Sequence, residues 1–265
     1  MKILTETWRS ESIGRPKSIT VALPPTYSST GKPFRVLYLL HSYAGNRMSW
    51  LRCPSLAARA ADLELVLVLP ESGRSWLVND ARGRRYEDYL VAEVVPHVDR
   101  HFNTSADRAG RAIAGFSMGG AGAFFHALRH SDLFSAAASN SGAFEAPLRH
   151  GDPYERHRGD RRLMMPTTAD HERVWGPVGS AVRRRYDPYR LLREREPDAA
   201  SLALHFDVGL ADYPRVISMN RNMRDALSAH GLPFEYRERR GGHDWAFVDA
   251  GIADLLGFVH DNLSG

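Results

Sequence analysis

Short apolar runs recur along the chain, and longer amphipathic stretches separate most of them. The runs cover residues 18–23, 34–40, 63–69, 111–116, 134–139, 201–206 and 234–239. Most of them are continuously apolar, which is typical of strands buried on both faces of a mostly parallel sheet. The pattern therefore predicts a strand at each of these places.

The stretches between the runs have the spacing of amphipathic helices. The clearest is 86–102, where apolar side chains recur at helical spacing and Pro96 predicts an irregularity. Gly231 is placed to end a later helix. The other expected helices are 49–61, 119–130, 213–231 and 244–263. Alternating strands and helices predict a three-layer α/β fold with a mostly parallel central sheet.

Residues 143–188 break the alternation. The segment contains no clear strand and is rich in Arg, His, Pro and Gly. Long irregular segments inside compact domains are usually functional or mobile. We expect one or two short helices here, lying over the active end of the sheet. The predicted organisation is a single domain over 1–265 with a cap-like insertion at about 143–188.

Composition narrows the class of protein. The 265 residues are 43% hydrophobic and 25% charged, which is ordinary for a globular domain. The formal charge of +4 comes from arginines scattered along the chain, so nucleic-acid binding is not expected. Cys53 is the single cysteine, which excludes an intramolecular disulfide and a cysteine-based zinc site.

The sequence does not predict a targeting signal. The opening residues MKILTETWRSE lack a basic stretch followed by an apolar one, so no signal peptide is expected. No apolar run approaches the roughly 18 residues that a membrane-spanning helix needs. These observations predict a cytoplasmic protein with no membrane partner.

A glycine-rich stretch, AGFSMGGAGAF at 114–124, surrounds one hydroxyl. It lacks the lysine of a Walker phosphate loop, and its glycines do not fit the GxGxxG dinucleotide fingerprint. What remains is GxSxG over 115–119, between an expected strand and an expected helix. That context is typical of a nucleophile elbow with Ser117 at its tip. The alternative is a structural turn in which Ser117 has no chemical role.

A serine nucleophile needs a base, and histidine is the usual one. His243 stands in RRGGHDWAF, between an expected strand and the last helix, and the order Ser…Asp…His suits this elbow. Otherwise His243 is a helix cap or a loop residue. For the acid that orients the histidine we favour Asp212, on the loop after residues 201–206, over Asp207 and Asp244.

Acyl transfer also requires backbone N–H groups that meet the developing oxyanion. The amide of Met118, directly after the serine, is one candidate. The loop LLHSYAGNRMSW at 39–50 supplies the other, for which we choose Tyr43, with Ser42 as the alternative. Glu87 and Asp88 lie at a helix start, where acids suit the helix dipole, and we assign them no catalytic role.

These motifs together resemble the esterase D-like branch of the α/β-hydrolases. That branch includes S-formylglutathione hydrolases, tributyrin-type carboxylesterases, and feruloyl and acetylxylan esterases. The resemblance covers about residues 18–259 and is weakest over 143–188. It implies an α/β-hydrolase fold, Ser117, Asp212 and His243 as the catalytic triad, and Tyr43 and Met118 as the oxyanion hole.

The chain departs from that family in the oxyanion loop. The family usually has His-Gly where this chain has His41-Ser42, which raises the question of a positive φ at Ser42. S-formylglutathione hydrolases tend to carry a cysteine in this loop, and this chain has Ala44-Gly45-Asn46 there.

The leading hypothesis is a serine carboxylesterase that acts on a small-molecule ester through an acyl-enzyme and needs no cofactor. The alternatives are an acyltransferase with the same triad, a thioesterase of the S-formylglutathione hydrolase type, and a non-catalytic binding protein. A homo-oligomer is left open. Candidate substrate contacts are His41, Ser42, Trp76 and Trp245.

Two charged groupings of the insertion have alternative interpretations. The histidines at 150, 157 and 171 match no zinc spacing, and we expect an exposed polar loop and no metal site. The arginines could bind a carboxylate or phosphate ester, but a solvated face paired with nearby acids is favoured. Those arginines are Arg158, Arg161, Arg162, Arg183, Arg184 and Arg185, and the acids are Asp152, Glu155, Asp160 and Glu172.

Overall fold

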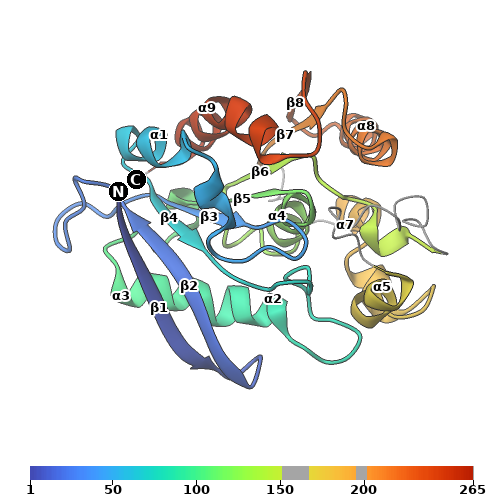
Figure 1. Cartoon of the computed structure of the whole chain (residues 1–265), viewed down its shortest axis with the longest axis horizontal. Helices are drawn as coiled ribbons and strands as arrows, with labels where there is room; N and C mark the ends of the chain where they lie inside the picture. Colours follow the sequence, from blue (N-terminus) through green and yellow to red (C-terminus); the bar gives the residue numbers. More distant parts are fainter. Residues whose placement is uncertain (151–166, 195–201, 265) are drawn as a thin grey trace.

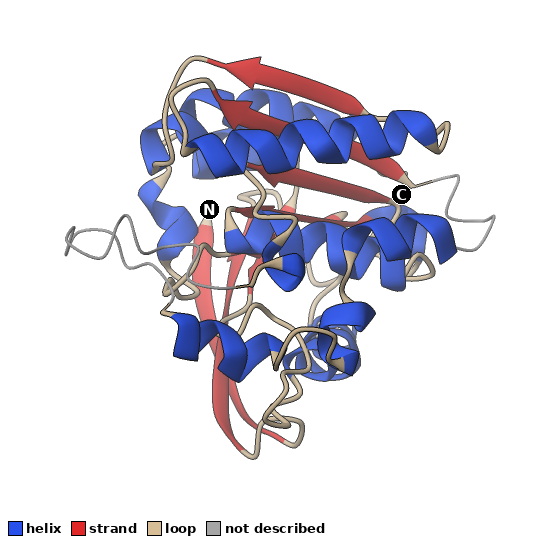
Figure 2. Ribbon diagram, turned by 90° about the vertical axis from the view of Figure 1, so that its right-hand side faces the viewer, coloured by secondary structure: helices blue, strands red, loops and turns tan. Residues whose placement is uncertain are grey.

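An eight-stranded sheet with helices on both faces forms the centre of the protein (Figures 1 and 2). The computed structural model describes residues 1–150, 167–194 and 202–264. In spatial order the strands are β1 (Lys2–Ser10), β2 (Arg15–Leu23), β4 (Val66–Leu69), β3 (Val36–Leu40), β5 (Arg111–Phe116), β6 (Ala136–Asn140), β7 (Ala203–Gly209) and β8 (Glu235–Arg239). The β1–β2 and β2–β4 pairs are antiparallel and the rest are parallel. The predicted mostly parallel sheet is confirmed, and all seven apolar runs contribute to strands.

Helices connect the strands and cover both faces of the sheet (Figure 1). They are η1 (Ser49–Arg52), α1 (Leu56–Asp62), α2 (Tyr86–Asp88), η2 (Tyr89–Val94), α3 (Val95–His101), η3 (Arg108–Gly110), α4 (Met118–Arg129), η4 (Ala146–Leu148), α5 (Thr168–Trp175), α6 (Ala181–Arg185), α7 (Pro188–Glu194), α8 (Pro214–Ala229) and α9 (Trp245–Asp261). The irregularity expected at Pro96 is a stretch of π-helix, η2, just before it, because proline cannot donate a backbone hydrogen bond. Gly231 follows α8 with φ +64°, as its predicted capping role requires.

Two hydrophobic cores lie on opposite faces of the sheet. Alternate residues of β3 divide between them, since successive side chains of a strand point to opposite faces. Val36, Tyr38 and Leu40 enter the core under α2, α3 and α4. Leu37 and Leu39 enter the core under α1 and α9. A central strand buried on both faces explains why its sequence is continuously apolar.

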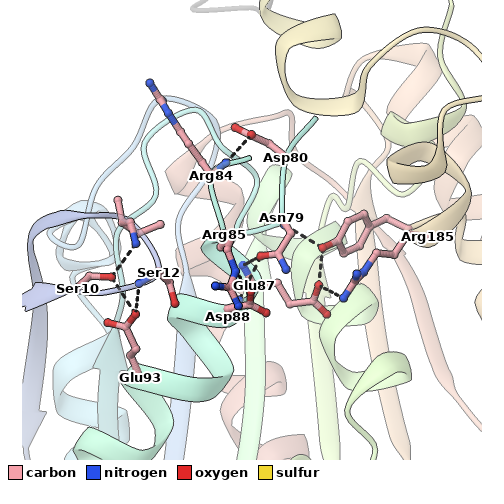
Figure 3. A network of polar contacts seen from close by, with 12 residues as sticks. Ser10, Ser12, Asn79, Asp80, Arg84, Arg85, Glu87, Asp88, Glu93 and Arg185 are labelled. Atoms are coloured by element: carbon pink, nitrogen blue, oxygen red, sulfur yellow. Dashed lines mark hydrogen bonds and ion pairs between the residues drawn. The ribbon is translucent and has the colours of Figure 1, made fainter. Parts of the chain in front are cut away.

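Strand β1 was not predicted from the sequence. Its half-buried positions alternate with exposed ones, and polar residues share the half-buried side, so no apolar run marks it. The β1–β2 hairpin extends beyond the rest of the sheet (Figure 1). One carboxylate fastens it to η2, because Glu93 accepts hydrogen bonds from Ser10 Oγ at 3.0 Å and the Ser12 amide at 2.7 Å (Figure 3). Glu93 also accepts from Trp8 Nε1 at 3.1 Å.

Buried histidines give the fold a dependence on pH. Burial is the main reason why the pKa of His126, in α4, and of His171, in α5, is lowered to about 4. His126 has no exposed surface, and the nearby Glu87 carboxylate, which raises its pKa, offsets only part of the effect of burial. At His171, the positive charges of Arg183 and Arg149 lower the pKa further. Both side chains are therefore neutral in the folded protein near pH 7.

We expect the free energy of unfolding to fall as the pH drops from about 6.5 toward 4.5. An unfolded histidine takes up its proton near pH 6.5, while the folded protein keeps His126 and His171 neutral to about pH 4. The unfolded chain then binds more protons, so acid favours unfolding. Each histidine adds a slope of up to about 1.4 kcal/mol per pH unit, measurable by urea unfolding at several pH values.

The control is an exposed histidine. His126→Asn should reduce the slope, whereas His230→Asn, at an exposed position after α8, should leave it unchanged. Equal slopes for the wild type and His126→Asn would contradict the assignment.

Candidate active site

Ser117 occupies a strained turn between β5 and α4. Its φ and ψ are +58° and −112°, a conformation that costs a non-glycine residue roughly 1–3 kcal/mol. Backbone bonds from neighbouring elements hold it there. The Ser117 amide donates to the Asn140 carbonyl at 2.9 Å, and the Ser117 carbonyl accepts from the amides of Ala121 at 3.1 Å and Ala143 at 3.2 Å.

The glycines around Ser117 are required by close backbone contacts. A Cβ on Gly115 would lie 2.1 Å from the carbonyl carbon of Gly119. A Cβ on Gly119 would lie 2.2 Å from the carbonyl oxygen of Leu40, at the end of β3. No side chain fits at either position, which explains the glycine-rich motif in terms of packing at the elbow.

A continuous hydrogen-bond chain runs from Asp212 through His243 to Ser117. His243 Nε2 lies 2.8 Å from Ser117 Oγ, and His243 Nδ1 lies 2.9 and 3.0 Å from the two carboxylate oxygens of Asp212. Because Nδ1 faces a carboxylate, it carries the proton and Nε2 is the acceptor for the serine hydroxyl. This is the arrangement that a general base for Ser117 requires.

Parallel pairing of β7 with β8 brings the histidine loop to the acid. The amide of Leu210 donates to the carbonyl of Arg239 at 2.8 Å, and the amide of Ala211 donates to the carbonyl of Gly241 at 2.9 Å. These bonds hold the loop after β7, which carries Asp212, against the loop after β8, which carries His243. The Asp212 side chain is buried, so its interaction with the imidazole is shielded from water.

The two alternative acids have other partners. Asp207 accepts from Arg239 Nη2 at 2.6 Å and Nε at 2.9 Å, and from Asn140 Nδ2 at 2.8 Å. Asp244 caps α9, because its side chain accepts from the Phe247 amide at 2.8 Å. Among the three candidates the structure therefore brings only Asp212 to the His243 ring.

The loop after β3 lies beside the elbow. Among the described residues, neither the Tyr43 amide nor the Met118 amide has a hydrogen-bond acceptor. The positive φ of this loop is at Ala44, +58°, and Ser42 has a negative φ. The serine that replaces the usual glycine of the resembling family therefore causes no backbone strain.

His41 holds this loop in place through both of its ring nitrogens. Its Nε2 accepts from the Ser72 amide at 3.0 Å, so its Nδ1 carries the proton and donates to the Ser42 carbonyl at 2.8 Å. Burial lowers the pKa of His41, which keeps this neutral form. Backbone groups thus occupy both ring nitrogens of the buried His41, and we do not propose it as a substrate contact.

The two candidate tryptophans lie in different cores. Trp76 is 3% exposed and packs against Trp175 of α5, with ring centroids 5.4 Å apart, and against Tyr43 at 6.5 Å. Trp245 packs on the other face of the sheet, against Trp50 at 5.3 Å and Phe116 at 5.2 Å. Of the two, only Trp76 contacts Tyr43 in the loop after β3.

The charged groups of the insertion are only partly described. Asp152, Glu155, His157, Arg158, Asp160, Arg161 and Arg162 lie outside the described residues. His150 is exposed, but His171 is buried, so the expectation of an exposed polar loop is wrong for His171.

The three described arginines of the cluster bind the protein itself. Arg183 is buried and donates to the carbonyls of Gly176 and Pro147, each at 2.9 Å. Arg184 donates to the Gly179 carbonyl. Arg185 pairs with Glu87 at 3.1 Å. The expected solvated face is therefore wrong for the buried Arg183, whereas Arg184 and Arg185 are exposed, with the Gly179 carbonyl and Glu87 among their partners in the described ranges.

One group of possible metal ligands occurs in the described part of the chain. Ligand atoms of Glu87, His126 and His130 lie within 4.8 Å of one another. Arg129 and Arg185 already contact the Glu87 carboxylate, at 2.7 and 3.1 Å. Two guanidinium groups on one carboxylate oppose a cation, so we interpret this group as an ion-pair cluster.

None of the helices in the described ranges combines the length and apolar character that crossing a bilayer demands.

Comparisons with known proteins agree on one family. A family model described as a putative esterase matches residues 10–257. An esterase from Mycobacterium tuberculosis is 29% identical over 255 residues, covering 89% of this chain and 54% of that protein. The chain thus spans about half the length of this relative. An acetyl esterase from Caldicellulosiruptor saccharolyticus is 27% identical, covering 84% of this chain and 82% of that protein.

A solved structure supports the same relationship. The substrate-bound fluorophosphonate-binding serine hydrolase F from Staphylococcus aureus has a TM-score of 0.81 at 27% identity, and the match covers 98% of each chain. The predicted α/β-hydrolase fold is confirmed.

Substitution of Gly119 tests the packing at the elbow. Gly119→Ala should destabilise the protein by about 1–3 kcal/mol or more, because the added methyl group overlaps the Leu40 carbonyl. Gly257→Ala is the matched control, since a Cβ there meets nothing within 4 Å and alanine favours the helix α9 by up to about 1 kcal/mol. Urea unfolding measures both changes, and equal effects would contradict the steric argument.

Proposed function

The chain belongs to the putative esterase family, and on this basis we propose that it is a serine carboxylesterase with Ser117, His243 and Asp212 as its catalytic triad. The observation that carries the proposal is the hydrogen-bond chain from Asp212 to Ser117 on a strained elbow. Strain persists where the surrounding structure over-determines a residue, and it clusters at functional sites.

The proposed reaction follows acyl-enzyme chemistry. Ser117 Oγ attacks the ester carbonyl carbon while His243 Nε2 takes the hydroxyl proton. The buried Asp212 carboxylate stabilises the imidazolium that results. The amides of Tyr43 and Met118 donate to the oxyanion of the tetrahedral intermediate.

The intermediate then collapses, and the ester C–O bond breaks. His243 returns its proton to the leaving alcohol, and an acyl group remains on Ser117. Water, activated by the same histidine, attacks this acyl-enzyme and releases the carboxylic acid. No cofactor is needed for any of these steps.

The alternatives use the same site differently. An acyltransferase would let an alcohol or amine replace the water, and product analysis with added acceptors distinguishes the two. A glutathione thioesterase is less favoured, because the single cysteine, Cys53, lies outside the 42–46 loop, and its thiol donates to Asp249 at 2.9 Å. The aligned triad argues against a non-catalytic binding protein.

The proposal extends to the domain organisation and the substrate. We assign residues 1–265 to one domain. Helix α5 of the cap-like insertion packs through Trp175 against Trp76, which contacts Tyr43. The proposed substrate is a small ester with a short acyl group, in keeping with the acetyl esterase relative. A cytoplasmic location, no nucleic-acid partner and an open oligomeric state stay predictions from the sequence.

Ser117→Ala should abolish hydrolysis of p-nitrophenyl acetate, with kcat falling by at least about 10⁴-fold because the nucleophile is lost. A fluorophosphonate probe should label the wild type at Ser117 and leave the variant unlabelled. Retained hydrolysis by Ser117→Ala would exclude the proposed nucleophile.

The two acids near the site should behave differently. Asp212→Asn should lower kcat by about 10⁴-fold, because the imidazole loses the partner that fixes its tautomer. Asp207→Asn should lower stability by about 1–3 kcal/mol through its bonds to Arg239, with kcat reduced less than about tenfold. If Asp207→Asn lowered kcat more than Asp212→Asn does, Asp207 would be the acid of the triad and Asp212 the structural carboxylate.

A further inference from the structure

Glu87 is a buried carboxylate that joins two regions of the chain. It lies in α2, is 1% exposed, and accepts from Arg129 Nε at 2.7 Å and His130 Nε2 at 2.8 Å, at the end of α4. It also contacts Tyr186 Oη and Arg185 Nη2, at 3.1 Å, at the end of α6 (Figure 3). We call these five residues the Glu87 cluster.

The Glu87 cluster also fixes the loop that contains Trp76. The Asn79 amide donates to Tyr186 Oη at 2.8 Å, and the Glu87 amide donates to Asn79 Oδ1 at 3.1 Å (Figure 3). Two residues further on, the Ala81 amide donates to the Val174 carbonyl of α5 at 2.8 Å. The loop is therefore held between α2 and the helices α5 and α6.

The segment next to Asn79 is strained. Trp76 and Leu77 have φ of +58° and +56°, a conformation that is unfavourable for non-glycine residues. Two consecutive residues of this kind need external restraint. The restrained Trp76 ring lies between Trp175 and Tyr43, the residue whose amide serves the proposed oxyanion hole.

Charge makes Glu87 difficult to replace. Burial by itself would raise the pKa of Glu87, but hydrogen bonds from His130 and Tyr186 and the charge of Arg129 hold it well below its usual range. The carboxylate therefore stays ionised and balances two guanidinium groups. A neutral side chain in its place would leave these cations without their counter-charge.

We propose that Glu87 is a positioning residue of the esterase: through Asn79 and Trp76 it sets the place of the Tyr43 amide. This rests on the proposed function. An oxyanion donor acts in the transition state, so its displacement lowers kcat more than it changes KM. Loss of stability alone would change neither constant once they are calculated per active site.

The test compares Glu87→Gln with Asp99→Asn. Asp99 is the matched control, because it also pairs with a buried arginine, Arg111, at 2.9 Å. Arg111 begins β5, whereas Ser117 follows the other end of that strand. Hydrolysis of p-nitrophenyl acetate gives kcat and KM, and a fluorophosphonate probe counts active sites. We expect Glu87→Gln to lower kcat per labelled site about tenfold, with KM within about threefold. Asp99→Asn should leave both constants within about twofold.

A second variant keeps the proposal testable if Glu87→Gln does not fold. Tyr186→Phe removes the hydroxyl that bridges Glu87 and Asn79 but keeps the ion pairs, and it should lower kcat about threefold. Both variants should also change the near-ultraviolet circular dichroism of the Trp76–Trp175 pair, which Asp99→Asn leaves intact.

The outcomes separate two kinds of failure. If the wild type is active and labelled, but Glu87→Gln (or, should it not fold, Tyr186→Phe) has the same kcat, KM and circular dichroism as Asp99→Asn, the positioning role is overturned and the esterase stands. If the wild type neither hydrolyses the ester nor reacts with the probe, the proposed function fails, and the role of Glu87 fails with it.

Discussion

The close approach of backbone to backbone at the elbow is the constraint on which the site depends. Helix α4 begins so near the end of β3 that Gly119 lies directly against the Leu40 carbonyl. This contact permits the sharp reversal after β5 that lifts Ser117 into its left-handed conformation. The same contact keeps the first turn of α4 beside the loop after β3. One packing interaction therefore positions Ser117 together with the backbone amides of Met118 and Tyr43.

Three buried carboxylates, two beside the elbow and one at the far end of α4, differ in their role because they differ in their partners. Asp212 faces an imidazole and so can stabilise a charge that appears during a reaction. Asp207 faces the guanidinium of Arg239 and holds two strand ends together. Glu87 faces two guanidinium groups and joins helices to a loop. Permanent counter-charges suit structure, whereas a titratable partner suits catalysis.

The parts of the fold that could be predicted from sequence are those determined by local pattern. Short runs identified seven strands, and most of these runs are continuously apolar because burial on both faces requires apolar residues throughout. The motif around Ser117 identified the elbow, since close contact requires glycine. Asp212 was preferred to Asp207 from its place on a loop, and the structure brings it to His243.

What could not be predicted depends on partners distant in sequence. Glu87 looked like an ordinary acid at a helix start, because its partners Arg129 and Tyr186 follow by 42 and 99 residues. Strand β1 lacked an apolar run, because one of its sides is exposed and its other side includes Glu6 and Ser10, whose partners His97 and Glu93 lie far along the chain. The buried state of His171 depends on packing around α5, which no local pattern reveals.

The N-terminal hairpin has a consequence for the edge of the sheet. Strand β1 forms one edge of the sheet, and it exposes Lys2, Thr5 and Arg9. Charged and polar side chains on an edge discourage pairing with the edge of another molecule. The strand that β1 covers, β2, is almost entirely buried along its second half. The hairpin thus covers the apolar strand β2 with a polar edge strand. A truncation that removes β1 would expose β2 as an apolar edge that can pair with a strand of another molecule.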